Sequence, residues 1–101
     1  MELLGTTTGS KTLNTDLFTA DLKNGAPSNY GGFIKLFVSV ATTSTVLITI
    51  DGTNYTALNS GNALTADVGY EFNIPTKNGD DINFQLGSSV TVDIFDVYYF
   101  D

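Results

Sequence analysis

The sequence predicts an all-β protein, a small antiparallel β-sandwich of jelly-roll type with an N-terminal arm. From Phe33 onward, apolar residues alternate with polar ones in several short runs, the period of a strand with one buried face. Gly, Asn, Asp or Pro bounds these runs, and short strands separated by turn residues are typical of a sandwich or a barrel. Charged residues make up only 15% of the chain, and Thr, Asn, Ser and Gly, which suit strands and turns, supply the polar surface.

The first 32 residues differ from the rest of the chain. They are rich in Thr, Gly, Asn and Ser, and the apolar residues that stand near helical spacing are Leu13, Leu17, Phe18 and Leu22. Because Thr and Asn compete with a helix, we predict a partly irregular N-terminal arm over residues 1–32, followed by a β-sandwich body over residues 33–101, in one domain. Two interpretations of the arm stay open: a frayed terminus, and a segment that orders on a neighbouring molecule.

Alternation predicts the strands of the body in order. The run "FIKLFVSVA" places Ile34, Leu36, Val38 and Val40 on one face and Phe33, Lys35, Phe37 and Ser39 on the other. The run "TVLITI" is expected to bury Val46, Ile48 and Ile50 and to expose Thr45, Leu47 and Thr49. The run "YEFNI" is expected to bury Tyr70, Phe72 and Ile74. The run "DINFQL" is expected to bury Ile82, Phe84 and Leu86 and to expose Asn83 and Gln85.

The last run, "VTVDIFDVYYF" (Val90–Phe100), changes phase. Its first half alternates through Val90, Val92 and Ile94, and its second half through Phe95, Val97 and Tyr99. A one-residue slip exchanges the faces of a strand, so a β-bulge near Ile94–Asp96 would reconcile the halves. The alternative is a strand that is buried on one face at first and on both faces afterwards. We favour the alternative, because Tyr98 and Phe100 are aromatic as well.

Two acidic turns are the candidate ligand sites. Asp51-Gly52 stands between two strand-like runs, and Asp-Gly is a strong signal for a two-residue hairpin turn. That turn would pair Ile50 with Thr53, Ile48 with Tyr55, and Val46 with Ala57. Calcium bound by Asp51 and Asn54 is the alternative, but the full EF-hand loop pattern is absent.

The second acidic turn is "KNGDDIN" (Lys77–Asn83). Asn78-Gly79 is interpreted as another hairpin corner, and Asp80 and Asp81 as solvated turn residues. Adjacent strand residues point to opposite faces, so these two carboxylates would not chelate together from within a strand. We therefore expect no metal and no cofactor at either turn.

The composition argues against catalysis. The chain contains no His and no Cys, so Ser-His and Cys-His nucleophiles are excluded and the usual zinc ligands are missing. No glycine-rich phosphate loop is present. Asp93 and Asp96 are the carboxylates that could act as acid and base, but nothing in the sequence marks them as buried. We expect a protein that is not an enzyme.

The charge and hydropathy of the chain limit the classes of partner that it is expected to bind. A net charge of −7 without a basic cluster disfavours nucleic acids and anionic membrane surfaces. The N-terminal stretch lacks the basic and apolar regions of a secretory signal, and no apolar run approaches the ~20 residues of a membrane span. These features predict a chain that is made and kept in the cytosol, or is released by lysis of the cell.

Aromatic residues are the most informative group. Seven Phe and five Tyr exceed what one thin core uses, and exposed aromatic clusters mark interfaces. The candidate interface residues are Phe33, Phe37, Tyr98, Tyr99 and Phe100. A second core layer and a sugar-stacking platform are the two alternatives.

From about Phe33 to the end, the order of segments resembles small β-sandwich structural proteins of tailed bacterial viruses, the decoration or adaptor class. The segments that carry the resemblance are "IDGTNYTALNSGNAL", "YEFNIPTKNGDDINFQL" and "VTVDIFDVYYF". The resemblance implies a bacteriophage virion component, at a capsid decoration, vertex, head–tail or tail adaptor position, that forms homo-oligomers such as trimers and binds a viral shell or tail protein. It carries over no catalytic residue. The rival class is a carbohydrate- or ligand-binding module, which usually displays surface Trp, and this chain has none.

Overall fold

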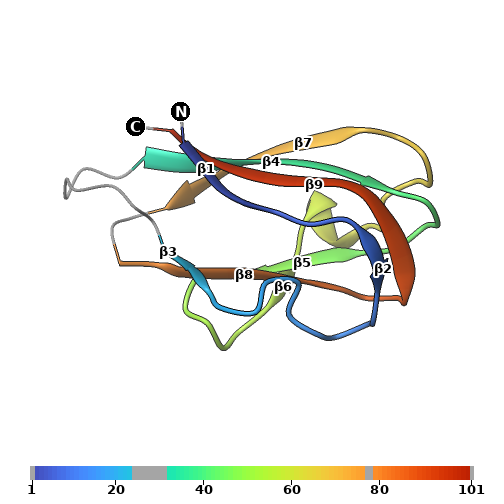
Figure 1. The fold of residues 1–101 in the computed structure, drawn as a ribbon, viewed down its shortest axis with the longest axis horizontal. Coiled ribbons are helices and arrows are strands. Elements are labelled where there is room, and N and C mark those ends of the chain that lie inside the picture. The colour runs from blue at the N-terminus through green and yellow to red at the C-terminus, as the bar shows by residue number, and fades with distance from the viewer. Residues whose placement is uncertain (1, 24–31, 77–78, 101) are drawn as a thin grey trace.

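The computed structural model describes residues 2–23, 32–76 and 79–100. These residues form nine strands and one short 3-10 turn (Figure 1). In chain order they are β1 (Glu2–Thr6), β2 (Gly9–Lys11), β3 (Leu22–Lys23), β4 (Gly32–Val40), β5 (Val46–Thr49), β6 (Thr56–Ala57), η1 (Asn59–Gly61), β7 (Tyr70–Thr76), β8 (Asp81–Leu86) and β9 (Val90–Phe100). The predicted all-β class is confirmed.

The strands form two antiparallel sheets, which lie one above the other in Figure 1. Sheet A has the order β1-β9-β4-β7, with β2 also paired to β9, and sheet B has the order β3-β8-β5-β6. The two sheets share one hydrophobic core. Its largest fully buried side chains are Phe84, Phe95, Ile34, Leu36, Leu64, Ile82, Leu86, Val38, Val40, Val46, Val92 and Val97. The inward positions predicted for β4 and β8 are therefore confirmed.

The N-terminal segment contributes to both sheets. β1 and β2 pair with β9 at one edge of sheet A, and β3 pairs with β8 in sheet B. Between them, the Leu17 N–H donates a hydrogen bond of 2.8 Å to the Phe84 carbonyl. Leu4, Leu17, Phe18 and Leu22 pack against the core. An arm that stands apart from the body is thus not confirmed for residues 2–23, and residues 24–31 of the expected arm lie outside the described residues.

The phase change in β9 is produced by a bulge. Ser39 of β4 lies opposite Ile94, but its neighbour Val40 lies opposite Val92, so the register shifts around Asp93. Ile94 is consequently exposed, whereas Phe95 points into the core. The strand buried on both faces, which we favoured, is wrong. The β-bulge that we considered first is present, slightly before the expected position of Ile94–Asp96.

Three predicted orientations in and next to sheet B are also wrong. Thr49 is buried and Ile50 is 45% exposed, because β5 ends at Thr49 and the chain turns before alternation can bury Ile50. Asn83 is buried, with 1% of its surface exposed, although its position in the run predicted an outward side chain. It is covered because its side-chain amide binds the backbone N–H and carbonyl of Phe18, at 3.2 and 3.0 Å.

The edges of both sheets are poor templates for adding another strand. In sheet A, the β1 edge carries a register shift between Leu3 and Gly5 and gives way to the separate strand β2. The other edge, β7, contains Pro75, which has no N–H to donate. In sheet B, the edge strands β3 and β6 are two residues long. Short, interrupted and proline-containing edges are how natural sheets avoid pairing with a neighbour.

Candidate functional site

The outer face of sheet A, turned away from the core, carries a group of aromatic rings. Phe33 of β4 stacks on Phe100 of β9, with ring centroids 5.2 Å apart and planes 4° from parallel. Phe37 meets Tyr98 edge-on, at 5.8 Å between centroids. All four rings are partly exposed. We call these four residues the aromatic face. It contains four of the five residues predicted to form an interface.

Tyr99 is the fifth residue predicted to lie at the interface. The structure places it in the core instead, so this prediction is wrong. Only 4% of its surface is exposed, and it belongs to the core between the sheets. The reason is alternation within β9: Tyr98 and Phe100 point outward, so Tyr99 between them points inward. The sequence run "YYF" alone does not reveal this phase, which depends on the bulge upstream.

Lys35 lies in the middle of the aromatic face. Its Nζ stands 5.4 Å from the centroid of the Phe100 ring and 6.0 Å from that of Phe37, distances at which a cation is attracted to a ring face. The same Nζ forms an ion pair of 2.7 Å with Glu71 of β7. The positive charge is therefore paired within the face, with a carboxylate on one side and two rings beside it.

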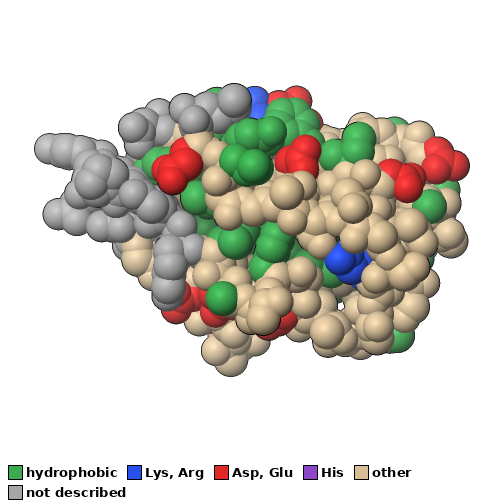
Figure 2. All heavy atoms as spheres, viewed as in Figure 1, with side chains coloured by type: hydrophobic (Ala, Val, Ile, Leu, Met, Phe, Trp, Pro, Cys, Tyr) green, Lys and Arg blue, Asp and Glu red, His purple; other side chains and the backbone are tan. Residues whose placement is uncertain are grey.

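Two aliphatic side chains stand at the margins of the aromatic face. Leu3 of β1 lies opposite Tyr98 and is 50% exposed, and Ile94 of β9 is 45% exposed. In Figure 2, hydrophobic side chains gather along the upper side of the molecule, over sheet A, with charged groups among them. Most large apolar side chains of a soluble protein are covered, so their concentration on one face indicates a contact surface.

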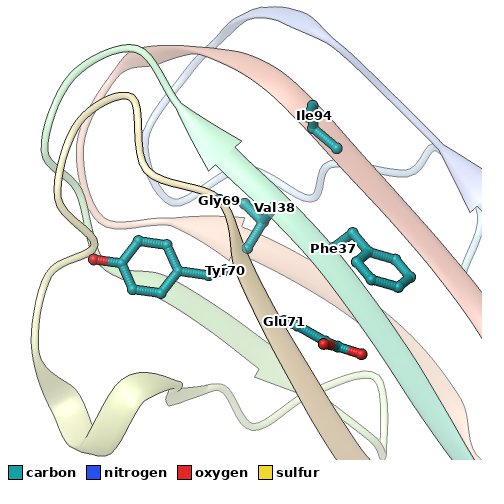
Figure 3. Close-up of a pocket in the computed structure, with 6 residues that line it drawn as sticks. All are labelled: Phe37, Val38, Gly69, Tyr70, Glu71 and Ile94. Atoms are coloured by element: carbon teal, nitrogen blue, oxygen red, sulfur yellow. The ribbon is translucent and has the colours of Figure 1, made fainter.

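An open hollow of about 230 Å³ adjoins the aromatic face beside Ile94. Its lining is mainly apolar and comprises Phe37, Val38, Gly69, Tyr70, Glu71 and Ile94. Figure 3 shows Phe37 and Glu71 projecting to the same side of the sheet, while Tyr70 projects to the other side. Gly69 presents no side chain, which leaves this end of the face recessed. The sequence offered no signal for the hollow.

The turn at Asp51 is wider than a two-residue hairpin. The pairing is Ile48 with Thr56 and Leu47 with Ala57, so the register predicted with Tyr55 is wrong by one residue. The Asp51 carboxylate accepts hydrogen bonds from the backbone N–H groups of Thr53 and Asn54, each at 2.8 Å. It also accepts bonds from the side chains of Asn54 and Thr49.

These hydrogen bonds explain the electrostatics of the turn. The pKa of the Asp51 carboxyl is held far below its usual range by the hydrogen bonds that it accepts. The largest contributions come from the backbone and side chain of Asn54, followed by Thr53 and Thr49. The carboxylate thus acts as the acceptor that closes the loop, with Gly52 supplying the positive φ of 80° that the turn requires.

The second acidic turn also differs from its prediction. β7 and β8, which flank it, belong to different sheets, so the connection crosses from sheet A to sheet B and is not a hairpin. Asp80 is buried, so it is not a solvated turn residue, and Asp81 is half-buried. Lys77 and Asn78 lie outside the described residues. Among residues 2–23, 32–76 and 79–100, no group of three or more acidic side chains is arranged to hold a metal ion.

The side of the molecule formed by sheet B and the segment that crosses it is polar and acidic. Tyr55 donates its hydroxyl hydrogen bond to Asp16, which also accepts a bond of 2.9 Å from Gln85. Burial, together with the Asp16 carboxylate, raises the pKa of the Tyr55 hydroxyl, so it stays protonated. Asp21 accepts a bond of 2.9 Å from Asn83. These contacts fasten the N-terminal segment to sheet B.

The two carboxylates considered for acid–base chemistry, Asp93 and Asp96, both lie on β9 outside the core. Asp96 lies on the outer face of sheet A, opposite Phe37, and accepts a bond of 2.5 Å from the Thr6 hydroxyl. Asp93 is exposed at the bulge. Neither residue lines the hollow beside Ile94. The absence of an enzymatic activity stays a prediction.

No helix within the described ranges has the length and apolarity to cross a membrane.

Comparisons of the chain with known proteins do not identify a family for it. No protein-family model matches the chain, and neither curated protein sequences nor solved structures gave a significant match.

Proposed function

We propose that this protein is a non-enzymatic structural subunit that works by association, through the outer face of sheet A, with further copies of itself and with a larger assembly. The observation that carries the proposal is the aromatic face: Phe33, Phe37, Tyr98 and Phe100 form a ring cluster outside the core. Rings of this size bury large areas on contact and dominate the energetics of interfaces. Tyr99 lies in the core and is not part of this cluster, so the four rings do not depend on it.

The blunted sheet edges favour a face over an edge as the place of association. A subunit that adds to a sheet edge needs a long strand with free backbone groups. The edge strands here are interrupted, contain Pro75 or have two residues. Apolar side chains stand on the sheet surface, where contact does not depend on backbone pairing.

We also propose that the fold is a jelly roll. When β1 and β2 are taken as one interrupted strand, the nine strands reduce to eight, and the first pairs with the last. The second then pairs with the seventh, the third with the sixth, and the fourth with the fifth. This nested pairing is that of one long hairpin rolled into two sheets, the arrangement of a jelly roll.

The kind of assembly follows from the resemblance to small structural proteins of tailed bacterial viruses. On that basis the assembly is a virion, the site of action is the particle, and the second partner is a shell or tail protein. Low charge content suits closely packed copies, because long charged side chains would obstruct contact. A shell position does not require a catalytic group.

Light scattering on the purified full chain over a concentration series tests the proposal. We expect the weight-average mass to rise above that of the 10.8 kDa monomer as concentration increases, and the chain to sediment with viral shells or tails. A monomer at all concentrations that also fails to bind particles contradicts the proposal.

A glycan array tests the competing carbohydrate-binding function. Stacking of Phe33 on Phe100 and the Lys35 ammonium above Phe100 already occupy ring faces on which a sugar would stack. We therefore expect no binding. Glycan binding that Phe37→Ala abolishes would favour the module instead.

A further inference from the structure

We propose that two copies associate face to face about a two-fold axis, with Leu3 of each copy seated in the hollow beside Ile94 of the other. This inference rests on the proposed function and specifies the geometry of self-association. A two-fold contact uses the same surface on both copies, so a projecting residue and its receiving hollow must both lie on that surface. The outer face of sheet A carries both features: Leu3 projects at the β1 margin, and the hollow opens between β4, β7 and β9.

Size and chemistry match between Leu3 and the hollow. The hollow of about 230 Å³ has a largely apolar lining that includes Phe37, Val38 and Ile94. One water takes up about 30 Å³ of the liquid, so the hollow has room for a branched side chain of four carbons. Seating Leu3 there covers two of the most exposed aliphatic side chains in the described residues, Leu3 and Ile94, in one contact.

Among the sides of the molecule, the charge distribution favours the outer face of sheet A as the place where two copies meet. The whole chain carries −7, so contact between two copies is unfavourable wherever acids concentrate. Asp16, Asp21, Asp51 and Asp81 lie on the side formed by sheet B. On the outer face of sheet A, Lys35 stands against Glu71 and Asp96, and the exposed Asp93 of β9 adds a third negative charge. Two copies therefore meet there with less repulsion than across the side formed by sheet B, and the Lys35–Glu71 ion pair offsets part of what remains.

The area of the face fits a reversible dimer. β4 has nine residues, which span about 30 Å, and four strands at about 4.8 Å span about 19 Å. The plan area is on the order of 550 Å² per copy, so two copies bury on the order of 1,100 Å², just below the standard range of interfaces. We therefore expect association that depends on concentration, as suits a subunit that is held finally by its assembly.

Disulfide cross-linking tests the geometry, because the natural chain has no Cys. Within one copy, Leu3 lies opposite Tyr98, and Ile94 is four residues further along β9, about 13 Å away. A disulfide needs Cβ atoms about 4 Å apart, so a bond between positions 3 and 94 joins two copies. We expect the Leu3→Cys/Ile94→Cys full chain to give a covalent dimer under mild oxidation, with 3–94 bonds identified by peptide mass spectrometry.

The matched control is Leu13→Cys/Ile94→Cys, since Leu13 is 44% exposed but follows β2 at the end of the sheet. We expect at least five-fold less covalent dimer from the control, with both variants keeping the circular dichroism of the natural chain. Equal yields, or bonds joining 3 to 3 or 94 to 94, would overturn the two-fold geometry. If the natural chain still self-associates in light scattering, such a result leaves the proposed function standing, whereas a monomeric natural chain overturns both.

Discussion

The ring of Phe18 packs against the ring of Phe95, with centroids 6.1 Å apart and planes at 60°. Phe18 comes from the segment between β2 and β3, and Phe95 comes from β9 of sheet A. Phe18 also meets Phe84 of sheet B edge-on, at 6.3 Å. One residue from the N-terminal segment therefore contacts the cores of both sheets, which makes that segment a structural part of the two-layer fold.

Phe18→Ala should lower the free energy of unfolding by about 2–4 kcal/mol, because it removes ring contacts with both sheets and leaves a cavity. Urea denaturation of the two chains measures the difference. Leu13→Ala, in the same segment but at an exposed position, should change stability by less than about 0.5 kcal/mol. Equal small effects of both substitutions would show that the segment is a detachable arm after all.

Gly5→Ala should destabilise the protein by about 1–3 kcal/mol through overpacking. A Cβ at Gly5 would stand 2.8 Å from Cε1 of Phe18 and 3.1 Å from Cδ2 of Leu22. The Phe18 ring lies against Phe84 and Phe95 and has little room to move aside. Gly69→Ala, where a Cβ meets no atom within 4 Å and φ is not positive, is the matched control and should change stability little. Thermal melts that show no loss for Gly5→Ala would place Phe18 elsewhere.

Asp51 should give the protein a specific acid sensitivity. Its folded-state pKa is depressed by hydrogen bonds from Asn54, Thr53 and Thr49, so its contribution to stability is fully present above the unfolded value of about 3.9. The contribution is lost as pH falls below about 4 toward the folded pKa. Between pH 5 and pH 2, the melting temperature of the natural chain should therefore fall more steeply than that of Asp51→Asn. Parallel pH profiles for the two chains would mean that the hydrogen bonds do not persist in solution.

Side-chain orientation was predicted correctly for strands that have one face against the core and the other against solvent. Ile34, Leu36 and Val38 follow this rule, and their alternation alone was sufficient. Asn83 did not, because its outward face is covered by Phe18, a residue 65 positions away. Period-two alternation records only the hydrophobicity of a side chain and not which distant segment crosses over it.

The aromatic face was predictable in part for a similar reason. Phe33 and Phe37 share one face of one strand by simple alternation, but their partners on β9 depend on the bulge at Asp93. A bulge inserts one residue and exchanges the faces downstream, and no residue in "VDIF" announces its position. The hollow beside Ile94 arises from three strands together, so no single run of the sequence could predict it.

Sedimentation equilibrium of the natural chain against Leu3→Ser/Ile94→Ser tests the association surface most directly. Both residues are about half exposed within one copy, so their replacement should leave the melting temperature nearly unchanged while removing the contact between copies. We predict a monomer–dimer equilibrium for the natural chain and a dissociation constant at least ten-fold larger for the variant. The matched variant Leu13→Ser/Ile50→Ser, with comparable exposure elsewhere, should behave like the natural chain. A natural chain that is purely monomeric, or a dissociation constant that the Leu3/Ile94 variant leaves unchanged, would contradict association through the outer face of sheet A.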